Sequence, residues 1–264
     1  MKYAHIADCH IGSWADPKMR HLNTEAFIRA VDKCIAEKVD FILISGDLFN
    51  SSLPAIDSLK ATVQKLRTIK NHKIPVYIIP GSHDFSPTGK TMIDVLCEAG
   101  LCKNVVKGEI HENKLKLKFT IDEKTGAKIT GMLGKKGMLE KTYYESLDNT
   151  EIEQESGYKI FMFHTALTEL KPKSLEKMES APVSLLPKGF DYYAGGHVHI
   201  IKEAELEGYK KIVYPGPLFP NNFREMEELG RGGFFIVEDD NARYVPIQIY
   251  NTHKISIKCG NKSV

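Results

Sequence analysis

The chain has 264 residues, of which 42% are hydrophobic and 27% are charged, a composition typical of globular domains rather than of disordered or fibrous chains. The 36 basic residues nearly balance the 34 acidic ones and leave a net charge of +2, so charge alone does not indicate a nucleic-acid-binding protein. The apolar runs have the length of strands and not of a membrane span. Because the first residues also lack the apolar region of a signal peptide, the sequence predicts a cytoplasmic protein.

The first half of the chain is predicted to alternate strands with helices. Apolar residues with helical spacing, and short apolar runs between them, place strands at residues 2–7, 41–45 and 74–79 and helices over 22–35, 56–69 and 91–99.

The second half is predicted to contain more strands. They are expected at residues 115–121, 159–163, 192–194, 212–214, 234–237 and 244–249. Two polar or proline-containing stretches, 140–157 and 171–189, are expected to run over the surface. This pattern indicates a mixed α/β fold with two packed sheets and outer helices.

The cysteines show no pattern typical of a disulfide framework or of a cysteine-ligated zinc site. They are odd in number, scattered and without a CxxC pair: Cys9, Cys34, Cys97, Cys102 and Cys259. Such usage favours a reducing compartment.

Five of the predicted strands end in short clusters that contain aspartate or histidine. The clusters are Asp8-Cys9-His10, Gly46-Asp47, Gly81-Ser82-His83-Asp84, His164 and Gly195-Gly196-His197-Val198-His199. Ligands of α/β proteins bind beyond the carboxyl ends of strands. Any one of these residues is weak evidence alone, but ionisable groups at five strand ends would make a poor core, because buried charges need partners. The joint pattern therefore indicates a functional site.

The residue types in these clusters suggest a metal site. Carboxylates and imidazoles without thiolates suit Mn²⁺, Fe²⁺ or Zn²⁺ better than Ca²⁺ or a structural zinc ion. Two such ions, bridged by a carboxylate, are a common device for cleaving phosphate esters, because they prepare the nucleophile and neutralise charge on the phosphoryl oxygens.

In their order along the chain, the clusters D-x-H, G-D, G-S-H-D, H and G-H-x-H resemble the five signatures of calcineurin-like metallophosphoesterases, over about residues 1–250. The segments HIADCHIG and SGDLFNSSLP, and YPGPLF followed by GGFFIVE, are most similar to the SbcD-type nuclease subunit of the double-strand-break repair complex. The resemblance implies an α/β fold, a two-sheet β-sandwich flanked by helices, in agreement with the pattern of predicted elements.

The resemblance also implies two divalent metal ions, with Mn²⁺ as the first choice and Fe²⁺, Zn²⁺ or Mg²⁺ as alternatives. The positions that match ligands are Asp8, His10 and His199 for the first ion, Asp47 for the bridge, and His164, His197 and Ser82 for the second. Ser82 stands where the family usually has a metal-binding asparagine, so weaker binding of the second ion is expected.

Three further positions match residues that act on the substrate. His83 matches the histidine that faces the scissile phosphate, and Asp84 is expected to orient the His83 imidazole, so both are expected to be catalytic. Asn50 stands where many family nucleases carry a histidine, and it is expected to bind a phosphate oxygen of the substrate.

The function implied is a Mn²⁺-dependent nuclease that acts on DNA ends or hairpins. Two alternatives stay open: a phosphatase or phosphodiesterase that acts on a small nucleotide or a phosphoprotein, and a metal-poor scaffold that kept the fold for protein binding. The SbcD-like segments argue against the first alternative, and the persistence of every Asp and His position argues against the second.

Residues 1–250 are expected to form the metallophosphoesterase domain, and 251–264 the start of a cap domain or a C-terminal tail. Residues 253–258 alternate as another strand would. In the family, a DNA-contacting cap begins here and is followed by helices that bind the SbcC-type ABC ATPase. Truncation within the cap is therefore the preferred interpretation, and a naturally capless enzyme is the alternative. A homodimer stays open, and no membrane association is expected.

Overall fold

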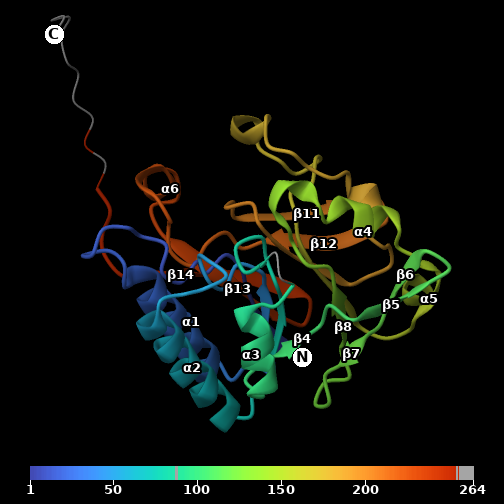
Figure 1. The fold of residues 1–264 in the computed structure, drawn as a ribbon, viewed down its shortest axis with the longest axis horizontal. Coiled ribbons are helices and arrows are strands. Elements are labelled where there is room, and N and C mark those ends of the chain that lie inside the picture. The colour runs from blue at the N-terminus through green and yellow to red at the C-terminus, as the bar shows by residue number, and fades with distance from the viewer. Residues whose placement is uncertain (87–88, 254, 256–264) are drawn as a thin grey trace, which may run out of the picture.

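Two six-stranded sheets organise the computed structural model, which describes residues 1–86, 89–253 and 255 (Figure 1). The first sheet consists, in spatial order, of β14 (Asn241–Ile247), β13 (Gly232–Glu238), β1 (Lys2–Ile6), β2 (Phe41–Ser45), β3 (Val76–Ile79) and β4 (Lys103–Asn104). The second consists of β11 (Lys202–Leu206), β12 (Tyr209–Tyr214), β10 (Tyr192–Gly196), β9 (Lys159–His164), β8 (Lys128–Gly131) and β7 (Thr120–Ile121). Two further strands, β5 (Gly108–His111) and β6 (Lys114–Leu117), form a separate two-stranded sheet.

Helices cover the outer faces of the sheets. The described helices are α1 (Leu22–Ala36), α2 (Ile56–Asn71), α3 (Met92–Glu98), α4 (Lys141–Glu145), α5 (Thr150–Gln154) and α6 (Phe223–Leu229), with 3₁₀ turns at Lys136–Met138, Lys173–Leu175 and Val183–Leu185. Figure 1 shows α1, α2 and α3 grouped on one side of the first sheet, and their apolar residues share a core cluster with that face of the sheet.

The two sheets pack face to face because their strands are apolar on both sides. In β1, Tyr3 lies in the cluster between the sheets, whereas Ala4 and Ile6 lie in the cluster under the helices. In β2, Phe41 and Leu43 follow the same alternation, as the two-residue period of a strand requires. The expected two-sheet β-sandwich flanked by helices is therefore confirmed.

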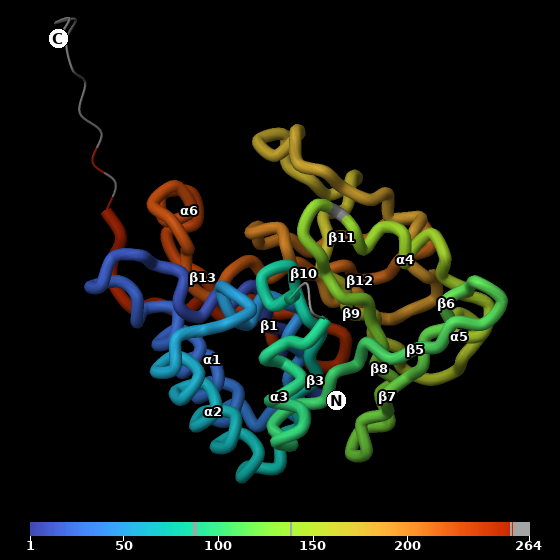
Figure 2. The backbone as a smooth tube through the Cα atoms, viewed as in Figure 1, coloured from blue at the N-terminus to red at the C-terminus, as the bar shows by residue number. Residues whose placement is uncertain are grey.

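The direction of the central strands brings their carboxyl ends to one edge. β1, β2 and β3 run parallel to one another, and so do β8, β9, β10 and β12 in the other sheet. Figure 2 traces β13 back beside β1, with which it pairs antiparallel, so the beginning of the chain and a late segment share one sheet. Within each sheet, the segments that follow these parallel strands lie at one edge, and the packing of the two sheets brings the segments after β1, β2, β3, β9 and β10 together.

The expectation of one strand over residues 115–121 is wrong. β6 pairs with β5, the Lys118 amide donates to the Lys107 carbonyl, and β7 pairs with β8 in the second sheet. The alternation of apolar and polar residues reports which side chains face inward, but it does not say where the backbone changes partner. β4, β5, β8 and β11 were also not predicted from the sequence.

The stretch 140–157, expected to run over the surface, contains α4 and α5. It buries Glu140, Tyr144 and Ile152, so it is part of the core and not only a surface excursion.

The strand expected near the end of the chain lies mostly outside the described residues. Among residues expected to form a strand at 253–258, His253 and Ile255 are described and have no regular structure, and the other four lie outside the described residues. Within the described part of the chain, every helix is too short or too polar to cross a membrane.

Candidate metal centre

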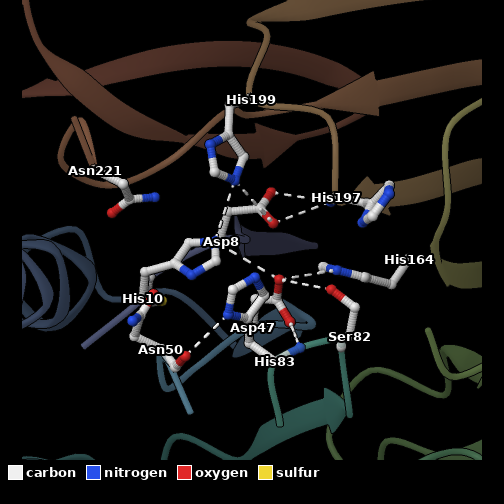
Figure 3. A network of polar contacts seen from close by, with 12 residues as sticks. Asp8, His10, Asp47, Asn50, Ser82, His83, His164, His197, His199 and Asn221 are labelled. Atoms are coloured by element: carbon white, nitrogen blue, oxygen red, sulfur yellow. Dashed lines mark hydrogen bonds and ion pairs between the residues drawn. The ribbon is translucent and has the colours of Figure 1, made fainter. Parts of the chain in front are cut away.

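The side chains at the five strand ends surround one point between the sheets (Figure 3). Several of them have left-handed backbone conformations, which non-glycine residues adopt rarely. The φ angles are 50° at Asp8, 43° at His10, 51° at Asp47 and 87° at His197. Such strain is concentrated at functional sites, where the surrounding structure enforces it.

Glycines allow the strand ends to approach closely. A Cβ on Gly46, whose φ is +86°, would lie 2.2 Å from His164 Nδ1, and one on Gly81 would lie 2.2 Å from Asp47 Oδ1. These contacts are shorter than any real Cβ contact, so a side chain at either position would displace His164 or Asp47.

Asp47 lies at the centre of the constellation. Its Oδ2 atom is 3.2 Å from His164 Nε2 and 3.6 Å from His10 Nε2, and it accepts a 3.4 Å hydrogen bond from Ser82 Oγ. Its Oδ1 atom accepts the backbone N–H of His83 at 2.7 Å. The carboxylate therefore contacts residues from three different strand ends.

A second carboxylate, Asp8, faces two histidines on the other side. His199 Nε2 lies 3.8 Å from Asp8 Oδ1 and only 3.1 Å from His10 Nε2. Three overlapping groups place their ligand atoms within 4.8 Å of one another: Asp8, His10 and His199; Asp8, Asp47 and His164; His10, Asp47 and His83. Because the groups share Asp8, His10 and Asp47, they form one continuous cluster of candidate ligands.

The histidines are oriented by partners at their other nitrogens. His199 Nδ1 is 3.0 Å from Glu225 Oε1, and His164 Nδ1 is 2.8 Å from the Ser45 carbonyl oxygen. A carbonyl or carboxylate at Nδ1 fixes the proton there and leaves Nε2 with its lone pair directed into the cluster, as in many metal sites. His164 Nε2 is buried and faces the Asp47 carboxylate, 3.2 Å from Oδ2, inside the cluster.

Glu225 is the residue that sequence reasoning missed. It lies in α6, where its backbone N–H donates to the Asn222 side chain at 2.9 Å and its Oε2 accepts the Asn221 N–H at 2.9 Å. The spacing Asn222-x-x-Glu225 is a helix-start signal that was readable from the sequence, but nothing in it pointed to His199.

Burial and neighbouring charges shift the protonation of the cluster in opposite directions. Burial lowers the pKa of His10 and of His197 to about 3, so both are neutral at pH 7, as metal ligands must be. Burial opposes a charge on His164 as well, but the adjacent Asp47 carboxylate raises the pKa of His164 to about 10, so without an ion the ring is protonated and a metal ion would displace the proton from Nε2. Burial and the nearby Asp47 charge raise the pKa of Asp8, because two buried carboxylates repel unless positive charge is close.

The expected contact between Asp84 and the His83 imidazole is wrong. The Asp84 carboxylate accepts three backbone N–H groups, from Leu48 at 3.2 Å, Phe49 at 3.0 Å and Gly81 at 3.0 Å. These bonds join the loops after β2 and β3. These three N–H groups, and not the His83 imidazole, are the hydrogen-bond partners of the Asp84 carboxylate. Burial and the nearby Asp47 charge raise the pKa of Asp84 to about 7.

Asn50 takes the place expected of Asp84. Its backbone carbonyl oxygen lies 2.9 Å from His83 Nδ1, so the ring is oriented by a main-chain group and not by the Asn50 side chain. Asn50 does not line the cleft into which His83 faces.

The cluster opens into a cleft of about 360 Å³. Its floor includes His10, Asp47, Ser82, His83, His197 and His199, and its walls come from the 172–178 segment and from α6. His197 packs its ring against His164, with 5.1 Å between centroids, and its backbone N–H donates to Asp8. His197 is thus near the cluster, but it belongs to none of the three ligand groups.

Comparison with known proteins agrees with this geometry. Residues 1–200 match the family model of calcineurin-like phosphoesterases. Two curated relatives are called DNA double-strand break repair protein Mre11. The protein from Archaeoglobus fulgidus is 28% identical over 98% of this chain, and the one from Methanopyrus kandleri is 30% identical over 93%. The chain spans 62% and 55% of their respective lengths.

Solved structures show the same fold at low sequence identity. The crystal structure of TT1561 from Thermus thermophilus has a TM-score of 0.58 and 15% identity, and covers 94% of this chain and 99% of that one. A dimetal phosphatase from Danio rerio has a TM-score of 0.56 and 10% identity, and covers 89% and 91%. The resemblance drawn from the sequence motifs is confirmed.

Proposed function

The chain belongs to the calcineurin-like phosphoesterase family, and we propose from this premise that it is a two-metal phosphodiesterase that hydrolyses DNA. The observation that carries the proposal is the position of Asp47, whose carboxylate lies 3.2 Å from His164 and 3.6 Å from His10. His10 follows β1 in the first sheet and His164 ends β9 in the second, so Asp47 is the group that would bridge two ions.

Seven residues are proposed as ligands of the two ions. Asp8, His10 and His199 would hold the first ion, Asp47 both ions, and His164, His197 and Ser82 the second. The donor set of carboxylates and imidazoles suits Mn²⁺, which we propose as the native metal, and also Fe²⁺, Zn²⁺ and Mg²⁺. Ser82 is the weakest of these ligands, because its hydroxyl is uncharged and already donates a hydrogen bond to Asp47.

Two divalent ions bound here would supply an activated water and neutralise charge on the phosphoryl oxygens. The protein itself supplies His83. Because a carbonyl oxygen can only accept, the bond to Asn50 places the proton on His83 Nδ1 and leaves Nε2 for a substrate in the cleft that His83 lines. A protonated Nε2 would stabilise the phosphate or protonate the leaving oxygen.

Asp84 contributes to this chemistry only as a positioning residue. Its bonds to the backbone of Leu48, Phe49 and Gly81 hold the loops that carry Asp47 and His83. We therefore propose that the loss of Asp84 disturbs the geometry of both residues.

The choice of DNA is supported by the relatives, which are named for double-strand break repair. DNA ends or hairpins as substrates, an SbcC-type ATPase as partner, and a homodimer are proposals that rest on the resemblance alone. The boundary near residue 250 and a cytoplasmic location likewise stay predictions.

One assay separates the candidates. The chain is supplied with Mn²⁺ and given linear duplex DNA, hairpin DNA and a chromogenic phosphodiester in parallel. We expect cleavage of DNA, and loss of more than about 100-fold in Asp47→Asn, since even changes beyond the metal ligands have effects of 10–100-fold. Asp240→Asn is the matched control, because Asp240 also has a positive φ, of 65°, but is exposed.

Other outcomes would favour the alternatives. Turnover of the diester without cleavage of DNA would indicate an enzyme that acts on small substrates. No turnover of any substrate at any Mn²⁺ concentration would indicate a scaffold.

A further inference from the structure

Two cysteines lie side by side at the end of α3, away from the metal centre. The sulfur atoms of Cys97 and Cys102 are 3.4 Å apart, and both cysteines are free thiols. The sulfur atoms of a disulfide are about 2 Å apart, so the two sulfur atoms need to move only a small distance toward each other to form one.

The backbone holds the two thiols together. Gly100 has a φ of +65° and ends α3 by donating its N–H to the Cys97 carbonyl at 2.8 Å, while the Leu101 N–H donates to the Leu96 carbonyl at 3.0 Å. This pair of bonds is a Schellman motif, which reverses the chain after a helix. Leu96 and Leu101 are both buried, which fixes the turn, and Cys102 is thereby returned to the side of Cys97.

The pair is accessible from one side. A cavity of about 480 Å³ is lined by both cysteines and by Lys70, Lys73 and Lys103. Cys97 is partly exposed, whereas Cys102 is 6% exposed. Lys103 pairs with Glu123 at 3.5 Å, and the charges of Lys70 and Lys73 favour a negatively charged reagent.

The two thiols differ in reactivity. The hydrogen bond from Cys102 lowers the pKa of Cys97, although burial and the carboxylates of Asp94 and Glu98 oppose this. The same hydrogen bond, together with burial, raises the pKa of Cys102. Cys97 is therefore the thiol that becomes a thiolate first, and thiolates are the nucleophiles in disulfide exchange.

We propose that Cys97 and Cys102 are a modification site that forms a reversible disulfide by exchange with an anionic small-molecule disulfide. The Cys97 thiolate attacks one sulfur of the reagent and releases the other half as a thiolate. Cys102 then loses its proton to solvent and attacks Cys97 Sγ, releasing the second half. Two protein thiols are oxidised and one external disulfide is reduced to two thiols. Cys102 precedes β4, which runs parallel to β3, so the pair lies at the end of these strands opposite His83.

The test uses oxidised and reduced glutathione with the folded chain. After the thiols are trapped by alkylation, trypsin releases residues 91–103, a peptide that contains Cys97 and Cys102 and no other cysteine. We expect the mass of this peptide to be two hydrogens lower than that of the dithiol peptide, and we expect neither cysteine to be alkylated. Cys102→Ser is expected to keep one glutathione on Cys97, and Cys97→Ser to carry none at Cys102. Cys34, fully buried, is the internal control and is expected to stay a thiol.

A synthetic peptide of residues 91–103 shows whether the fold matters. Because the fold holds the thiols together, we expect the folded chain to be oxidised at a ratio of oxidised to reduced glutathione at least about tenfold lower than the peptide needs. A folded chain that needs the same ratio as the peptide, or a higher one, would overturn the proposal. Cystamine, a cationic disulfide, is expected to react more slowly than oxidised glutathione at low salt, and equal rates would refute the preference for anions.

Discussion

Asp8, His10 and Asp47 have left-handed backbones that are held by bonds between their own loops. The Asp8 N–H donates to the Gly46 carbonyl at 3.2 Å, and the His10 N–H donates to the Asp47 carbonyl at 2.9 Å. Each such conformation costs on the order of 1–3 kcal/mol. The loops after β1 and β2 therefore stabilise each other, and the side chains of the proposed metal centre are oriented before any ion arrives.

Glu225 is predicted to control the first metal position through His199. Burial raises the pKa of Glu225, but the hydrogen bond and charge of His199, together with hydrogen bonds from Asn221 and Asn222, lower it below its ordinary value, so the residue is ionised at neutral pH. Glu225→Gln removes the charge that makes His199 more basic. We expect the affinity for Mn²⁺ to fall by about 10-fold, measured by calorimetric titration.

The matched control is Glu228→Gln. Glu228 is in the same helix and lines the same cleft, but it pairs with Arg224. Equal losses of affinity in the two variants would show that the general charge of the cleft, and not the contact with His199, determines metal binding.

Ser82 is predicted to weaken the second metal position. An asparagine carbonyl reaches farther than the serine hydroxyl, which is 3.4 Å from Asp47. In Ser82→Asn we expect the second Mn²⁺ to bind about 10-fold more tightly while the first is unchanged, since one ligand of the second ion is restored. Calorimetric titration of both proteins, with the exposed Ser156→Asn as a control, tests this. Indistinguishable affinities would mean that the Ser82 hydroxyl already serves as a ligand.

At the scale of elements, the interface between the sheets contains a polar pair in addition to its apolar core. His5 in β1 is fully buried and its Nδ1 lies 3.0 Å from the Tyr192 hydroxyl in β10. Its Nε2 has no hydrogen-bond partner among the described residues. Burial without a charged partner lowers the pKa of His5 to about 3, so the ring is neutral in the folded protein.

This neutral histidine is predicted to make stability depend on pH. The unfolded chain binds a proton at His5 below its ordinary pKa of about 6.5, whereas the folded chain binds it only near pH 3. The contribution of His5 is complete above pH 6.5 and is lost as pH falls toward 3. At pH 5 the loss is about 2 kcal/mol, at 1.36 kcal/mol per pH unit.

Chemical denaturation of the parent and of His5→Gln between pH 7 and pH 5 measures this term. The parent is expected to lose about 2 kcal/mol more than the variant over that interval. Parallel curves for the two proteins would show that His5 does not titrate on unfolding.

The whole molecule carries a net charge of only +2, so it is not expected to bind DNA through charge as a whole. If the chain binds DNA as proposed, a few local phosphate contacts around the cleft are expected to supply the affinity. We expect the chain, without divalent metal so that no cleavage occurs, to bind linear duplex DNA with a Kd in the range of about 10⁻⁴–10⁻⁶ M.

Because it relies on phosphate contacts, the proposed DNA binding is expected to be sensitive to salt. The affinity is expected to fall steeply between about 50 and 200 mM salt, because each phosphate contact releases counterions. Fluorescence anisotropy with a labelled duplex measures both values. Tight binding that does not change over this salt range would contradict a phosphate-only interaction.

Much of the fold and of the candidate site was predictable from the sequence. The apolar runs that became β1, β2, β3, β9 and β10 and the polar residues after them are local signals, because burial of alternate side chains and the end of a strand are determined by neighbouring residues. The convergence of neighbours within each sheet also follows, such as Asp8 with Asp47, since the carboxyl ends of parallel strands meet at one edge. The approach of Asp47 to His164 joins the two sheets and was decided by how the sheets pack.

The contacts that complete the site were decided only by the tertiary structure. Asp84 holds Leu48 and Phe49, Asn50 orients His83 by its carbonyl oxygen, and Glu225 reaches His199 across 26 residues of chain. A residue's type does not state its partner, because hydrogen bonds are made by whichever donors and acceptors the packed loops bring together. What the sequence determined by itself was the pattern of local burial and the chemistry at the strand ends, and what only the folded chain decided was which atoms meet.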